Sequence, residues 1–98
     1  EIDLARDRAL EHHKLAIKSA EIRSKAVDVN VAELRKRVAN IEKAGRKVPP
    51  NIQEQLEQTL RESRDLQRTI HTNELALQQV RERYETDKLR FRQLTAKP

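Results

Sequence analysis

The three histidines are the residues of this 98-residue chain that come closest to a metal site. His12 and His13 are adjacent, so on a helix their side chains point about 100° apart. His71 lies far along the chain, whereas a zinc site needs three or four converging ligands. We therefore expect no metal site and no cofactor.

Motifs for covalent or phosphate chemistry are also missing from the sequence. It contains no P-loop, no Gly-rich dinucleotide turn, no nucleophile elbow and no His-Glu-x-x-His pattern. It has no cysteine, which excludes disulfides and thiol chemistry but identifies no compartment. We expect a protein that is not an enzyme and has no catalytic residues.

Two stripes of seam residues, spaced alternately by four and three positions, lie on either side of Pro49-Pro50. This spacing is typical of the helix faces that pair in coiled coils. After the prolines the stripe is Ile52, Leu56, Thr59, Ser63, Leu66, Ile70, Asn73, Leu77, Val80, Tyr84, Asp87, Phe91 and Leu94. Before them it is Arg6, Leu10, His13, Ile17, Ala20, Ser24, Val27, Val31, Leu34, Val38, Ile41, Gly45 and Val48.

The stripes predict an all-α fold, in which two long helices form an antiparallel coiled-coil hairpin with its turn at Val48–Asn51. The helices are expected over about 2–45 and 51–95, in a single domain. Folding at the prolines would make the numbers of opposed residues sum to about 100, with a slip of one heptad as the main alternative. Small residues then face larger ones, as Ala20 faces Val80, which favours even packing along the seam.

Local signals predict where the helices end. Asn51 with Glu54 three positions later is typical of a capping box that opens the second helix. Gly45 is a candidate left-handed cap for the first helix. The β-branched segment 26–31 is the one place where that helix could break, but the stripe runs through it unbroken, so we expect one continuous helix.

A lone two-helix hairpin buries only one seam, and ordering about 90 residues costs on the order of 100 kcal/mol. The hairpin is therefore marginal by itself, and apolar residues outside the seam suggest a further contact. We expect these residues either to widen the seam or to form a mid-rod surface for self-association. They are Leu15, Ile22, Ala26, Val29, Leu60, Leu75 and Leu89.

Polar residues at seam positions predict layers that fix the register. In the expected register His13 faces Asp87, and Val27 faces Asn73. Buried polar residues in coiled coils specify register at a cost in stability. The alternative for His13 beside a carboxylate is a pH-sensitive latch. The sequence favours the register role.

The net charge of +5 invites a nucleic-acid hypothesis. A basic-tipped helical hairpin that turns on prolines resembles, in architecture only, the tRNA-binding arm of seryl-tRNA synthetases, and no synthetase motif accompanies it. Aromatics make up only 2% of the chain, so few side chains could stack on bases. The basic tip comprises Arg35, Lys36, Arg37, Lys43, Arg46 and Lys47.

Together these features predict a non-enzymatic structural or protein-interaction module. Its expected partner is a second copy, in a dimer or four-helix bundle, or another helical protein. The alternatives are a hairpin that contacts nucleic acid or the ribosome, and a signalling rod between further domains. The chain starts at Glu1 and contains no methionine, so we expect it to be a piece of a longer protein. No apolar run is long enough to predict a membrane span.

Overall fold

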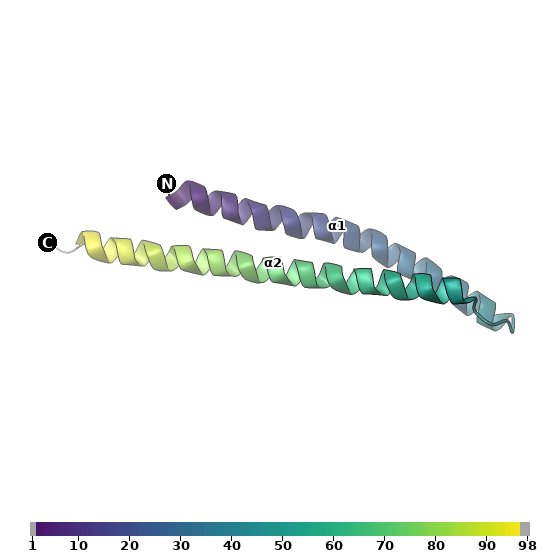
Figure 1. Ribbon diagram of the computed structural model, residues 1–98. Helices are drawn as coiled ribbons and strands as arrows, with labels where there is room; N and C mark the ends of the chain where they lie inside the picture. Colours follow the sequence, from purple (N-terminus) through teal and green to yellow (C-terminus); the bar gives the residue numbers. More distant parts are fainter. Residues whose placement is uncertain (1, 97–98) are drawn as a thin grey trace.

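The computed structural model describes residues 2–96, which form two long helices. Helix α1 (Ile2–Lys43) and helix α2 (Pro50–Ala96) lie side by side and antiparallel, in a rod of 83 × 16 × 16 Å (Figure 1). The predicted all-α helical hairpin is thus confirmed. Helix α1 is continuous through the β-branched segment 26–31, as expected, because the seam it buries extends over the whole segment.

Helix α1 ends in a left-handed glycine cap. Gly45 has a φ of 72°, a conformation that costs glycine little and other residues more. The Arg46 amide donates a hydrogen bond to the carbonyl oxygen of Ile41 (3.1 Å). The Gly45 amide donates another to the carbonyl oxygen of Glu42 (3.0 Å). This pair of hydrogen bonds is a Schellman motif, so the predicted role of Gly45 is confirmed.

Helix α2 begins at Pro50. Its first backbone acceptor is the carbonyl oxygen of Pro49, which receives the amides of Ile52 (3.1 Å) and Gln53 (3.3 Å). Proline suits the first helical position because its φ is already helical and the amide it lacks would have no partner there. Asn51 therefore lies inside the first turn of α2, and the expected capping box does not form.

The connection between the helices spans residues 44–49, earlier in the chain than the expected turn at Val48–Asn51. Helix α1 stops at Lys43 because Gly45 takes the left-handed conformation directly after its last turn. Gly45 thus sets the fold point, meaning the place where the chain turns back on itself. The prolines set the start of α2.

The seam holds the core of the rod. Every predicted stripe member from Arg6 to Tyr84 is buried or half-buried, except Gly45 in the connection. No side chain in the described part of the chain is fully buried, as expected for a rod only two helices wide. The most buried seam residues are Ala20, Ser24, Val27, Val31 and Leu34 on α1 and Thr59 on α2.

The register of the two helices differs from the expected one. The Arg6 guanidinium lies over the ring of Tyr84, 5.4 Å from its centroid, whereas the sequence had placed Ile17 opposite that tyrosine. Applied along both stripes, this contact makes opposed residue numbers sum to about 90 instead of about 100. The predicted register was therefore wrong: each α1 residue lies opposite an α2 residue about ten positions earlier in the chain than expected, a shift of close to three helical turns.

The shift follows from the position of the fold point. A hairpin folded at Gly45 brings the start of α2 back alongside the last turns of α1, as Figure 1 shows at the tip. Helix α2 consequently runs past the start of α1 at the other end of the rod (Figure 1). The last predicted seam residues, Asp87, Phe91 and Leu94, are exposed. Asp87 lies level with Asp3 in the first turn of α1, and Phe91 and Leu94 lie farther along α2.

Candidate interaction surfaces

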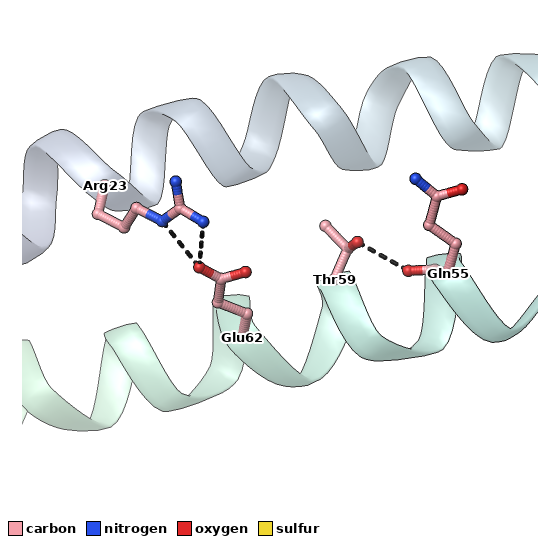
Figure 2. Close-up of polar contacts among 4 residues, drawn as sticks. All are labelled: Arg23, Gln55, Thr59 and Glu62. Atoms are coloured by element: carbon pink, nitrogen blue, oxygen red, sulfur yellow. Dashed lines mark hydrogen bonds and ion pairs between the residues drawn. The ribbon is translucent and has the colours of Figure 1, made fainter.

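An ion pair on the flank of the seam joins the two helices. The Arg23 side chain on α1 reaches Glu62 on α2, with Nε 2.8 Å and Nη2 2.6 Å from Oε1 (Figure 2). Both side chains are partly exposed, at 61% and 42%. Exposed pairs of this kind contribute about 0.2–1 kcal/mol, so this one adds more to alignment than to stability.

The two buried hydroxyls of the seam are both satisfied. The Thr59 hydroxyl donates to the Gln55 carbonyl oxygen one turn earlier in α2 (2.7 Å, Figure 2), so it needs no partner on α1. The Ser24 hydroxyl on α1 accepts a hydrogen bond from the Gln67 amide on α2 (3.1 Å). Because an unpaired buried polar group costs about 1–3 kcal/mol, these bonds let small polar residues occupy the seam.

His13 and Asn73 form a polar layer of the seam. The Asn73 amide nitrogen donates to the Thr69 carbonyl oxygen (2.8 Å), and its Oδ1 lies 2.9 Å from Nδ1 of His13. The acceptor is therefore Asn73, and His13 is the donor. The predicted pairings of His13 with Asp87 and of Val27 with Asn73 were wrong, because both depended on the register.

This pairing also removes the basis of the predicted pH latch. Nδ1 of His13 carries a proton both in the imidazolium and in the neutral tautomer that donates to Asn73. The bond can thus form in either charge state, and within residues 2–96 no carboxylate forms an ion pair with this ring. A device that fixes the register remains the interpretation of this layer.

The apolar residues outside the seam do not form one surface. Three of them lie midway between seam residues of α1, two positions from the nearest seam residue on either side: Leu15, Ile22 and Val29. Two positions correspond to a rotation of about 160–200° around the helix axis, so these side chains lie opposite the seam. They therefore point away from α2, and their seven-residue spacing places them in one row along α1. We call them the outer row of α1; Ala26 lies beside it.

The outward-facing leucines of α2, Leu75 and Leu89, lie on the opposite side of the rod. Each is two positions from its neighbouring seam residues, so each points away from α1. Leu60 is half-buried beside the seam and widens it. The observed register places Leu75 level with Leu15, but the two leucines face opposite directions. The seven predicted residues therefore separate into two opposed faces and one seam extension.

The basic tip is exposed throughout. Three of its residues, Arg35, Lys36 and Arg37, are consecutive on α1, so their side chains project about 100° apart around the helix. The structure thus brings the six residues to one end of the rod without gathering them on one face. The other three are Lys43, Arg46 and Lys47.

Metal-ligand residues do not cluster in the described part of the chain: no group of three or more histidines, aspartates or glutamates could hold an ion there. Across residues 2–96, neither helix has a stretch long and apolar enough to cross a membrane.

Comparison of the chain with models of protein families, with curated proteins and with solved structures found no match in any of the three.

Proposed function

We propose that the chain is a non-enzymatic protein-interaction module that self-associates through the outer row of α1. One observation carries the proposal: Leu15, Ile22 and Val29 are 57%, 63% and 60% exposed in a single row on the side away from α2. Scattered surface leucines are ordinary, but apolar residues repeated every seven positions suit a second helix.

Charge favours a second copy as the occupant of this row. Residues 1–32 carry six basic and six acidic side chains, so two copies meeting there bring together no net charge. The excess of basic residues lies elsewhere, near the tip and near the end of α2. Arg23, on the flank of the outer row, is already paired with Glu62. Charge repulsion between two copies is therefore smallest along this part of the rod.

Side-chain size supports the same contact. Ser19 and Ala26 alternate with the large residues of the outer row at spacings of four and three. In an antiparallel pairing, Leu15 can pack against Ala26 of the second copy, and Ile22 against Ser19 of the second copy. Large residues against small ones let two helices approach closely along an isologous contact.

The expected dimer is weak. Six large side chains, three from each copy, would each gain about 1.5–3 kcal/mol if they passed from full exposure to full burial. They are already two-fifths buried, so the attainable gain is roughly 5–10 kcal/mol. Association itself costs about 4–15 kcal/mol. The balance predicts association that depends strongly on protein concentration.

Two glutamate variants at matched outward positions test the proposal. Ile22→Glu places charges at the centre of the contact and should give a monomer in sedimentation velocity. Leu75→Glu makes the same change on the opposite side of the rod and should sediment like the wild type. Helicity by circular dichroism should be similar in both variants, because neither residue lies in the seam. Loss of the dimer in Leu75→Glu but not in Ile22→Glu would assign the contact to α2 instead.

A nucleic-acid contact at the basic tip is a second candidate, favoured by the exposure of all six basic residues at one end. Binding through phosphates releases counterions, so affinity would fall steeply with salt. We expect only weak RNA retention that disappears near physiological salt, because the cations radiate around the rod. Tight retention that persists there and is lost on glutamine replacement of the tip residues would establish this function instead.

A further inference from the structure

The outward face of α2 carries its charges in separate blocks. Side chains spaced alternately by three and four positions share one side of a helix, and the row that contains Leu75 points away from α1. Along this row the arginines come before Leu75 and the glutamates come after it. We call it the charged row of α2. Its members, all exposed, are Arg61, Arg64, Arg68, His71, Leu75, Gln78, Glu82 and Glu85.

The two blocks are placed symmetrically about Leu75. Arg68 lies seven positions before this leucine and Glu82 seven positions after it, so each is about 10.5 Å away along the helix axis. Arg64 and Glu85 lie eleven positions before it and ten after it, about 15–17 Å away. A row with opposite charges at equal distances from its centre is complementary to a second copy of itself turned end for end.

The charges of the row are available to a partner. Arg64 and Glu85 form no ion pair with any other residue between 2 and 96. Arg68 lies 3.9 Å from Asp65, but the two side chains are 81% and 73% exposed, so this pair leaves the guanidinium accessible. Glu82 accepts one hydrogen bond from its own helix, which leaves further acceptor sites on the carboxylate.

We propose that the charged row of α2 is a second contact surface between copies of this chain, in which two rods meet antiparallel with Leu75 at the two-fold axis. Arg68 then lies beside Glu82 of the second copy, and Arg64 beside Glu85 of the second copy. Leu75, which is 47% exposed in the single rod, packs against its own counterpart. The outer row of α1 lies on the opposite side of the rod, so the two contacts do not compete.

Charge favours this alignment over the other alignments of two such rows. A parallel pair would place arginine beside arginine and glutamate beside glutamate, which opposes association. An antiparallel pair centred on Arg61 would also join opposite charges, because Glu54 and Glu57 precede the arginines. That pair would bring two copies of Arg61 together at its axis, whereas the axis at Leu75 is uncharged and apolar.

The contact is expected to be weaker than that of the outer row of α1. Exposed ion pairs contribute little each and are screened by salt. Each copy also buries one leucine here, compared with three large residues in the outer row of α1. The contact therefore adds little to the native mass. Disulfide trapping can detect it, because the chain contains no cysteine and a single introduced one reports on one position.

The test follows disulfide formation under mild oxidation in the Ile22→Glu background, which removes the contact through the outer row of α1. Leu75→Cys places the two thiols at the axis and should give linked dimer at least about tenfold faster than Leu89→Cys. Leu89 is the matched control because it is exposed on the same face of α2, but its two copies would lie about 42 Å apart in this dimer. The advantage of position 75 should shrink in about 1 M salt, where charges act over only about 3 Å.

Exchange of charges tests the pairs themselves. Arg64→Glu with Arg68→Glu makes all four paired positions acidic, and Glu82→Lys with Glu85→Lys makes all four basic. Combined with Leu75→Cys, each pair of changes should slow linkage between identical copies, because like charges then meet. A mixture of the two variants should restore fast linkage, because every pair is again opposite in charge.

Two results would overturn the proposal. One is equal rates of linkage at positions 75 and 89, and the other is a mixture that links no faster than either charge variant alone. Circular dichroism should show unchanged helicity in all the variants, because none of the changed residues lies in the seam. Because the outer row of α1 is already disabled by Ile22→Glu, failure of that proposed contact leaves this one intact.

Discussion

Replacing Gly45 with alanine tests how the connection sets the fold point of the hairpin. A Cβ at this position would meet no atom within 4 Å, so the substitution introduces no clash. Its cost arises from the φ of 72°, which disfavours a residue with a Cβ by about 1–2 kcal/mol. Alanine also reduces the freedom of the unfolded chain, which offsets about 0.4–1 kcal/mol. The net expectation is a destabilisation of roughly 1 kcal/mol.

Thermal unfolding followed by circular dichroism measures this effect at a fixed protein concentration, because dimerisation would raise the melting temperature. For a chain of this size, about 1 kcal/mol lowers the melting temperature by roughly 4–8 °C. Gly45→Asn is the control, since asparagine tolerates the left-handed conformation better than alanine and should lose less. An unchanged or higher melting temperature for Gly45→Ala would refute the argument that the left-handed glycine defines the connection.

Three further predictions concern the seam. Cysteines at Val27 and Ser63, opposed in the observed register, should form an intramolecular disulfide under mild oxidation; preferential bonding from position 27 to position 73 would restore the register expected from the sequence. Arg23→Ala should lower the free energy of unfolding by less than about 1 kcal/mol in urea titration, and a much larger loss would show that the exposed pair has a greater role. Replacing His13 and Asn73 together with leucine should raise the melting temperature and allow disulfides in more than one register, whereas a lower melting temperature would contradict the view that this layer trades stability for alignment.

The spacing of the stripes predicted the hairpin and its buried face because helix periodicity alone decides which residues share a side. The register was not predictable from side-chain volume. Ala20 opposes Ile70 in the structure and Val80 in the expected layers, so a small residue meets a larger one in both. Volume matching therefore does not distinguish the two alignments. The deciding feature was Gly45, whose role as a cap was predicted without its consequence for the fold point.

The candidate surface was predicted only in part for a similar reason. The exposed residues Leu15 and Leu75 were identified as apolar and outside the seam, which sequence shows directly. Each of them lies two positions from the seam residues of its own helix, so each points away from the other helix. This separation onto opposite sides of the rod could have been predicted from the sequence. The exposure of Phe91 was not expected, because the predicted register placed Leu10 opposite it. In the structure Leu10 is half-buried and Phe91 is exposed.

The native mass of the unmodified chain tests the central claim most directly. Sedimentation equilibrium over a range of concentrations reaching about 1 mM should show the mass rise from 11.5 kDa toward twice that value. Leu15, Ile22 and Val29 would then be covered in the dimer and exposed in the monomer. A mass that stays at 11.5 kDa over the whole range would contradict self-association through the outer row of α1.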